Sequence, residues 1–303
     1  MGVQDLDASI RLYRDGCGLA HTGTATYSPP GSDGATGCLD AARLGRPDVI
    51  GSAGIRLVRC PGPAGRSAGQ TRLLGGLGTG FTTSDIHRLH LRLDGHGVRF
   101  LSPPLELSPE PGDEAGPRRF EAFSQTVDGE FIVLVERRRA PGPYGTIDPH
   151  SLLSEPLHTS HVVDDLDGCC RFMEEVLDHR VMFSEVCSGE LFERLMAIEP
   201  GSSFRFRMLG HPERETGRII FIEFDGEARE VKPDVRHPQR GLFGLSYRCD
   251  DLDRRVEAAG SLGVGVLLSP GQASRRQPGD GRRAVLAAPF GILLELCQRA
   301  EES

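Results

Sequence analysis

The chain has 303 residues and a formal net charge of −8 at pH 7, so its surface offers no positive field for nucleic acid or for an anionic membrane. With 38% hydrophobic and 26% charged residues, it has the composition of a globular protein that can bury a core in each of two domains. No apolar run reaches the roughly 18 residues of a membrane span, and the 8 cysteines form no Cys-x-x-Cys pair, so we expect a cytoplasmic protein with free thiols and no membrane or nucleic-acid partner.

A tripeptide recurs along the chain at a nearly constant interval. Its leading aspartates lie about 80, 80 and 86 residues apart, and an internal period of this kind indicates repeated structural units. The copies are Asp5-Leu6-Asp7, the degenerate Asp85-Ile86-His87, Asp165-Leu166-Asp167 and Asp251-Leu252-Asp253. We therefore expect four copies of one module, which we number one to four in chain order.

The modules alternate between two types. Residues 10–15 match residues 170–175, and residues 97–103 match residues 263–270, so module one resembles three and module two resembles four. This order implies two homologous halves, and the Pro- and Gly-rich residues 137–150 are expected to link them. We predict an N-terminal pair of modules over residues 1–140 and a C-terminal pair over residues 150–303.

Each module is expected to consist of a strand, a helix and three further strands. In module three, a β-prone run over residues 157–163 precedes Asp165, whose carboxylate can accept the unpaired N–H groups of a helix's first turn. The following residues Phe172, Met173, Val176 and Leu177 have the spacing of one buried helix face. Three strands are then predicted at about residues 179–186, 203–208 and 218–224.

Alternation within these strands predicts one apolar face and one polar face. Phe204, Phe206 and Met208 share one face of their strand, and Arg205 and Arg207 share the other. The acids of the closing strands, Glu223 and Glu295, alternate with apolar residues in the same way. We expect the apolar faces to pack on the helices, while the polar faces line a cavity that two paired sheets enclose.

The order of strand, Asp-Leu-Asp, helix and three strands, closed by the sequence Pro-x-Gly-x-x-x-Glu-Leu at residues 289–296, resembles the vicinal oxygen chelate superfamily. This superfamily includes glyoxalases, bleomycin-resistance proteins and ring-cleaving dioxygenases. The resemblance implies an α+β fold of four βαβββ modules paired into two cup-shaped domains. It does not fix the function, because the scaffold hosts isomerases, lyases, dioxygenases, thiol transferases and drug-sequestering proteins.

The resemblance also implies where a divalent metal would bind. A first-strand histidine seven residues before the capping aspartate corresponds to His158, and the glutamate of the closing sequence corresponds to Glu295. These side chains suit Fe, Mn, Zn or Ni. The third position holds Gly244, so the metal set is predicted as His158, Glu295 and Glu223, the last preferred over His161; a cup without metal is an equal alternative.

In the N-terminal pair, the corresponding positions hold Gly78 and Val133, so we expect that pair to be degenerate and free of metal. Ring cleavage is not favoured either. The tyrosine that precedes the closing sequence in the dioxygenases is replaced by Val285, and residues 277–284 contain no histidine.

His158 and Glu295 are also the predicted catalytic pair, as acid and base, whether or not a metal is present. Arg205, Arg207 and Ser246 are predicted to bind the substrate, the arginines through planar donor forks that suit a carboxylate or enolate oxygen. The alternative for the two arginines is a solvated strand face.

Two functions of different classes follow from these residues. The first is a small-molecule enzyme that catalyses proton-transfer-driven isomerisation, elimination or cyclisation of an oxygenated metabolite, such as a polyketide or another secondary metabolite. The second is a non-catalytic protein that sequesters a hydrophobic natural product. The retained His158 and Glu295 favour the enzyme, the lost ligand positions favour the binding protein, and the sequence leaves a homodimer open.

Overall fold

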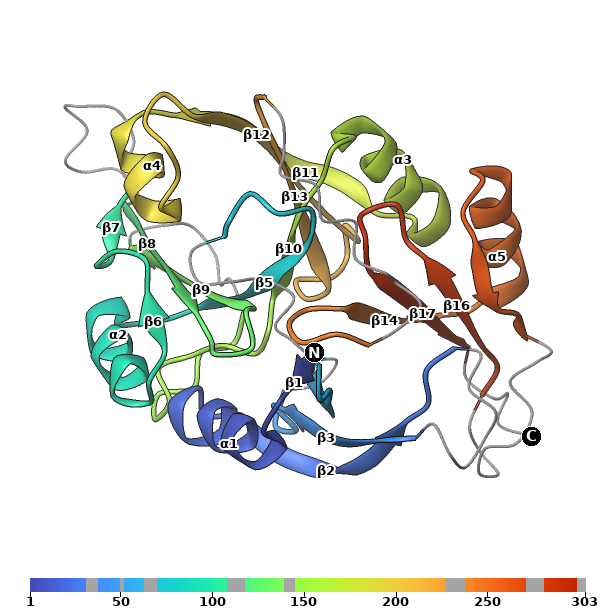
Figure 1. Cartoon of the computed structure of the whole chain (residues 1–303), viewed down its shortest axis with the longest axis horizontal. Coiled ribbons are helices and arrows are strands. Elements are labelled where there is room, and N and C mark those ends of the chain that lie inside the picture. The colour runs from blue at the N-terminus through green and yellow to red at the C-terminus, as the bar shows by residue number, and fades with distance from the viewer. Residues whose placement is uncertain are drawn as a thin grey trace.

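The computed structural model describes residues 1–30, 38–49, 52–62, 70–107, 118–138, 145–226, 238–270 and 281–298 (Figure 1). Residues 139–144 of the predicted linker lie outside the described residues. Among the described residues, none of the helices combines the length and the apolar composition that a membrane crossing requires.

The four predicted modules are present, each built from a strand, a helix and further strands. Module one comprises β1 (Gly2–Val3), α1 (Leu6–Arg11), a π-helical turn η1 (Leu12–Gly16), β2 (Ala20–Tyr27), β3 (Leu39–Gly45) and β4 (Ile55–Arg59). Module two comprises β5 (Gly75–Thr82), α2 (Ile86–Gly95), β6 (Arg99–Phe100), β7 (Leu105–Glu106), β8 (Arg118–Gln125) and β9 (Phe131–Arg138).

Module three comprises β10 (His158–Val162), α3 (Leu166–Leu177), β11 (Arg180–Ser188), α4 (Glu190–Met196), β12 (Ser203–Gly210) and β13 (Arg218–Phe224). Module four comprises β14 (Gly244–Cys249), α5 (Leu252–Ser261), β15 (Val266–Leu268), β16 (Arg283–Ala287) and β17 (Leu293–Gln298). Helix α4 is an addition to the βαβββ plan and follows the edge strand β11.

The repeated aspartate is the N-cap of the first helix in every module. Its carboxylate accepts a hydrogen bond from the backbone N–H three residues later, at 2.8–3.0 Å, in Asp5, Asp85, Asp165 and Asp251. This bond satisfies one of the N–H groups that a helix leaves unpaired at its start. The period in the sequence is therefore a period of helix starts.

The sheets pair modules from different halves of the chain. First strands β5 and β10 run antiparallel side by side and join modules two and three into one nine-stranded sheet. Modules one and four each form a four-stranded sheet, and β1 meets the segment before β14, where Gly2 and Gly241 exchange two backbone hydrogen bonds of 2.8 Å. The predicted pairing of one with two and of three with four is therefore wrong for the sheets, because repeat similarity does not determine which strand edges meet.

The two modules within each half are held together on their helix sides instead. One buried core contains residues of α1 and α2 and of the helix-facing sides of the strands in modules one and two. A second core contains residues of α3 and α5 and of the helix-facing sides of the strands in modules three and four. Figure 1 shows α1 beside α2 and α3 beside α5. Each module thus packs its helix against the other module of its half and its sheet against a module of the other half.

A double-mutant cycle tests the contact between modules two and three. A side chain at Gly80 of β5 would collide with the His158 ring of β10. Gly80→Ala should therefore lower the free energy of unfolding by about 1–3 kcal/mol through overpacking, and His158→Ala should relieve this cost in the double variant. Urea unfolding of the four proteins measures the coupling; Gly260→Ala, whose added Cβ meets no atom within 4 Å, is the control. Additive effects would contradict the pairing.

Candidate functional site

Each pair of sheets has an inner face, away from its helices. We call the inner face of modules two and three the two–three cup and that of modules one and four the one–four cup. The inner face is identified by register: in β13, Ile219 and Phe221 belong to the core under α3, whereas Ile222 and Phe224 belong to a separate inner cluster. The same alternation assigns the residues of the other strands to a face, apart from the strand irregularities.

The two–three cup is filled by apolar side chains. The sheet contributes Phe131, Val133, Phe204, Ile222 and Phe224 to a buried cluster, and the segment around α4 covers them with Leu195, Met196 and Ile198. This face therefore serves as a hydrophobic core between the sheet and α4.

His158 lies on the same inner face, over Gly80. Its side chain is buried, and its Nδ1 atom has no hydrogen-bond partner among the described residues. Burial, with a smaller contribution from the charge of Arg218, lowers the pKa of His158 from 6.5 to about 4. The imidazole is therefore neutral at pH 7.

The predicted metal set is not assembled. His158 lies in the two–three cup, Glu295 lies in the one–four cup, and Glu223 lies on the helix side of β13, where its Oε1 accepts a hydrogen bond of 3.1 Å from the Leu166 N–H. No three His, Cys, Asp or Glu side chains in the described part of the chain lie close enough to hold one metal ion. The same separation means that His158 and Glu295 do not form the predicted acid–base pair.

The error over Glu223 has a simple cause in strand register. Ser246 stands opposite Glu295, and the equivalent Ser160 stands opposite Ile220, so Ile220 is the counterpart of Glu295. Glu223 lies three residues further along and binds the start of its module's helix, as Glu136 does in module two by accepting from the Ile86 N–H at 2.9 Å.

The predicted substrate-binding arginines also lie on the helix side. Arg205 forms an ion pair with Glu223, and Arg207 forms one with Asp167 at the start of α3. The alternation of Arg and Phe was predicted correctly, but the faces were reversed, because Phe204 belongs to the inner cluster. Neither guanidinium reaches a cup.

The one–four cup holds a buried charge cluster around Glu295. Its Oε1 accepts a hydrogen bond of 2.9 Å from Arg283, and its Oε2 accepts bonds of 3.1 Å from both Arg56 and Ser246. The Glu295 side chain is only 12% exposed, whereas Arg56 keeps 33% of its side chain accessible. Of the predicted site residues, the structure thus brings Glu295 and Ser246 together in a cup, whereas Arg205 and Glu223 meet on the helix side.

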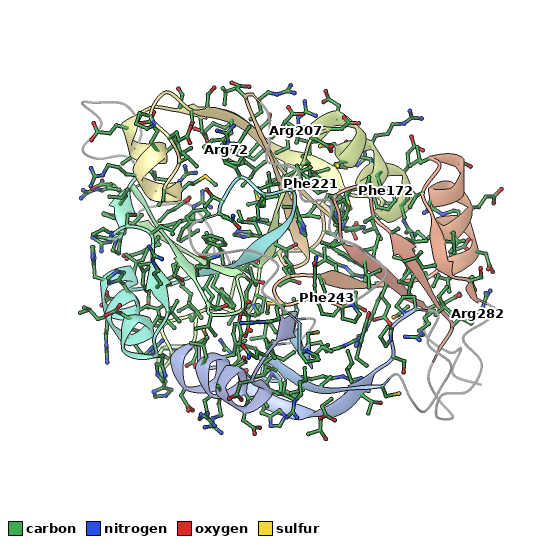
Figure 2. The ribbon with its side chains drawn as sticks, in the orientation of Figure 1. Arg72, Phe172, Arg207, Phe221, Phe243 and Arg282 are labelled. Atoms are coloured by element: carbon green, nitrogen blue, oxygen red, sulfur yellow. The ribbon has the colours of Figure 1, made fainter. Side chains whose placement is uncertain are left out.

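Apolar side chains surround this cluster. They come from both modules: Ala41, Val58 and Cys60 from module one, and Phe243, Val285 and Leu293 from module four. Tyr27 packs edge-on against Phe243, with ring centroids 5.6 Å apart, and Phe243 lies between the two modules in Figure 2. The site thus combines an apolar wall with a few convergent polar groups, as small-molecule sites commonly do.

The cluster fixes the charge of Glu295. Burial alone would raise its pKa, but the charges of Arg56 and Arg283, with hydrogen bonds from Arg283 and Ser246, outweigh burial and hold the pKa below 4.5. Burial and the nearby Glu295 charge raise the pKa of Tyr27 to about 12. At neutral pH the site therefore contains an ionised carboxylate, a neutral phenol and two guanidinium ions.

Sequence reasoning missed Arg56 and Arg283. Strands β1 and β4 are paired, with Val58 opposite Gly2 and Arg59 opposite Val3. Continuing this register backwards places Arg56 level with the position five residues before the N-cap Asp5. This is the level at which Glu295 faces Ser246, five residues before the N-cap Asp251. Counting the same register in module one would have identified Arg56 as the counterpart of Glu295.

These residues do not fit the metal that the resemblance implies. In the one–four cup the ligand positions are occupied by Gly244, Arg56 and Glu295, and a permanently charged guanidinium has no lone pair to offer a metal. In the two–three cup the ligand positions are occupied by Gly78, Val133, His158 and Ile220, and of these only His158 has a side chain that can bind a metal. The inner strand face of the one–four cup instead carries Arg43, Arg56, Arg248 and Arg283, with Glu295 as the one acid among its described strand residues.

Comparison with known proteins supports the fold. No family model and no curated protein matches the chain. Glyoxalase I from Zea mays is similar over 98% of this chain and 89% of its own, with a TM-score of 0.62 and 17% identity. A mutant of that enzyme gives 0.64 and 18% over the same shares, and a candidate dioxygenase from Bacillus subtilis gives 0.53 and 14% over 98% and 83%.

At these identities the likeness concerns the fold. The predicted α+β fold is confirmed, since the chain and glyoxalase I from Zea mays share it over most of both chains.

The buried His158 should make stability depend on pH. Because its pKa is about 4 in the folded chain and 6.5 when exposed, the unfolded chain binds more protons between these values. Its contribution to stability is complete above pH 6.5 and is lost as the pH falls toward 4, by at most about 3 kcal/mol.

Urea unfolding of His158→Gln from pH 4 to pH 8 should therefore show a shallower fall below pH 6.5 than the unaltered chain. A smaller slope should remain, since burial also lowers the pKa of His179 to about 4. His21→Gln, which changes an exposed histidine, is the control. Parallel pH profiles for His158→Gln and the unaltered chain would show that His158 is accessible to solvent.

Proposed function

We propose that the one–four cup is the functional site and that it binds a small oxygenated molecule through a carboxylate, enolate or similar oxyanion. The observation that carries this proposal is the contact of Glu295 with Arg56, Arg283 and Ser246 inside an apolar wall. The predicted catalytic role of His158 is not retained, because that side chain lies in the other cup.

Guanidinium ions can provide the electrostatic stabilisation that a metal ion gives to a bound oxyanion. A planar fork donates two parallel hydrogen bonds to an oxyanion, and such charge-assisted bonds are about twice as strong as neutral ones. Groups that are already oriented and partly buried stabilise developing negative charge without reorganisation. Arg56 and Arg283 are oriented by Glu295 before any ligand arrives.

Binding would also change the basicity of Glu295. The two arginines now hold its pKa below 4.5, which makes it a poor proton acceptor at neutral pH. A substrate oxyanion that takes over their hydrogen bonds would neutralise their charge, and burial would then raise the pKa. We propose that Glu295 becomes the proton acceptor in this state and that the reaction is an enolisation leading to isomerisation, elimination or cyclisation.

Sequestration of a hydrophobic natural product without chemistry is the second candidate. The aromatic and aliphatic wall around Tyr27, Phe243, Val285 and Leu293 favours it. Location in the cytoplasm and a homodimer remain predictions.

Binding and proton transfer can be measured separately. Binding of small 2-oxo acids, followed by calorimetry, should weaken about tenfold or more in Arg56→Gln and Arg283→Gln through loss of a charge-assisted bond. Arg59→Gln is the control, since Arg59 lies on the helix face and pairs with Asp40 at 3.6 Å. Glu295→Gln should tighten anion binding, because a competing carboxylate is removed.

Deuterium uptake next to the carbonyl in D₂O, followed by proton NMR, reports enolisation. Glu295→Gln should slow uptake by at least about 100-fold, the range of a general base. Binding without uptake in the unaltered chain would identify the sequestering protein instead. If no anion binds in an Arg56-dependent way, the proposed site is wrong.

The proposal also predicts metal content. Protein purified without chelator should contain Fe, Mn, Zn and Ni far below one equivalent, since Arg56 replaces a ligand and its charge repels a cation. Elemental analysis of the unaltered chain and of Glu295→Gln checks this. One equivalent of metal that disappears in Glu295→Gln would show that Glu295 is a ligand and that the arginines move aside.

A further inference from the structure

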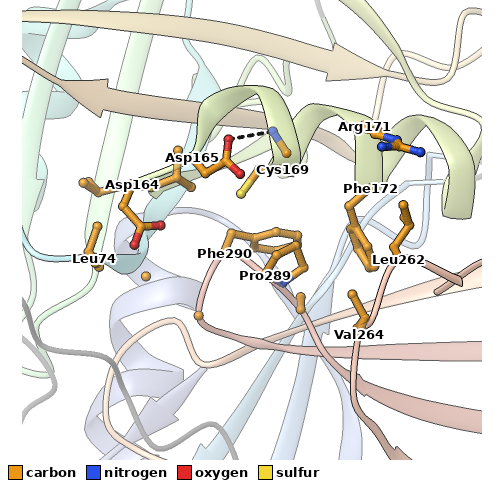
Figure 3. Close-up of a pocket in the computed structure, with 16 residues that line it drawn as sticks. Leu74, Asp164, Asp165, Cys169, Arg171, Phe172, Leu262, Val264, Pro289 and Phe290 are labelled. Atoms are coloured by element: carbon orange, nitrogen blue, oxygen red, sulfur yellow. Dashed lines mark hydrogen bonds between the residues drawn. The ribbon is translucent and has the colours of Figure 1, made fainter. Parts of the chain in front are cut away.

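A second concave site lies away from both cups, between modules three and four (Figure 3). It is a cleft of about 550 Å³, bounded on one side by the start of α3 and on the other by the turn between β16 and β17 and the segment after α5. Leu74, at the beginning of module two's first strand, closes one end. Its volume lies in the range of small-molecule sites, roughly 300–1,000 Å³.

The floor of the cleft is apolar and partly aromatic. Phe172 of α3 and Phe290 of the β16–β17 turn meet edge to face, with ring centroids 6.0 Å apart, and both are almost fully buried. Leu262 and Val264 form the wall on the module four side and are only half-buried. Apolar surface thus remains accessible from the cleft.

The charges that face this floor are negative. Asp164 and Asp165 both line the cleft, and the Asp164 carboxylate points into it (Figure 3). Asp164 makes no hydrogen bond or ion pair with any described residue, whereas Asp165 uses one oxygen to cap Gly168 at 2.8 Å. Arg171 is the one basic residue of the lining; it points away from the acids in Figure 3 and pairs with Glu175 at 2.6 Å.

The start of α3 does not make the cleft a site for anions. Helix starts attract anions through unpaired N–H groups, but here the Leu166 N–H is bonded to Glu223, the Gly168 N–H to the Asp165 carboxylate and the Cys169 N–H to the Asp165 carbonyl. The charge presented to a ligand is therefore that of the two aspartates.

We propose that this cleft binds a small organic cation, a protonated amine with an apolar body. The amine lies against the Asp164 carboxylate, and the body covers Phe290, Phe172, Leu262 and Val264. The site is separate from the one–four cup, so it does not depend on the function proposed above.

Three probes with one body and different charges test this assignment: 4-phenylbutylamine, 4-phenylbutan-1-ol and 4-phenylbutanoate. Calorimetry on the full chain at low salt should give the tightest binding for the amine, weaker binding for the alcohol and the weakest for the carboxylate. Equal affinities, or a preference for the carboxylate, would overturn the proposal.

Two variants assign the binding to the cleft. Asp164→Asn should weaken the amine about two- to fivefold, as expected for a pair near solvent, and leave the alcohol unchanged. Asp250→Asn is the matched control, because Asp250 precedes the N-cap of α5 as Asp164 precedes that of α3. Val264→Trp should block all three probes, and its urea midpoint checks that it is folded. If Asp164→Asn and Asp250→Asn behave alike, the amine binds elsewhere and the proposal fails.

Discussion

The antiparallel contact between β5 and β10 determines how the rest of the molecule is arranged. It joins two modules that are not neighbours in the repeat and leaves modules one and four to face each other. Because β10 approaches so closely, position 80 has no room for a side chain beside the His158 ring. The inner face of this sheet then becomes a hydrophobic core under α4, and the buried charge cluster around Glu295 forms in the other cup.

The fold was predictable because its signals are local. A capping aspartate, a helix with one apolar face and alternating strands each depend on a few adjacent residues, and all four modules kept them. The pairing of modules was not predictable, since it depends on which strand edges meet. The site was predictable only where the closing sequence was intact: Glu295 and Ser246 lie together in a cup, whereas His158 lies in the other one.

The reversed faces of β12 and β13 show why charge alone is a poor guide to a cavity. Arg205, Arg207 and Glu223 were assigned to the inner face because a helix was expected to cover the apolar one. Both faces of these strands are in fact covered, the outer one by α3 and the inner one by α4. The charged side chains lie at the margin of α3. There Glu223 accepts a hydrogen bond from the Leu166 N–H, and Arg207 forms an ion pair with Asp167.

The crossed arrangement of the modules has a consequence for assembly. Each cup needs one module from each half, so a half-length ancestor could have built the same cups only by associating with a second copy of itself. In the present chain that association is intramolecular, and mass action no longer governs it. Dilution therefore cannot open the cups, and the two cups are free to diverge, one into a packed core and the other into a face with a buried charge cluster.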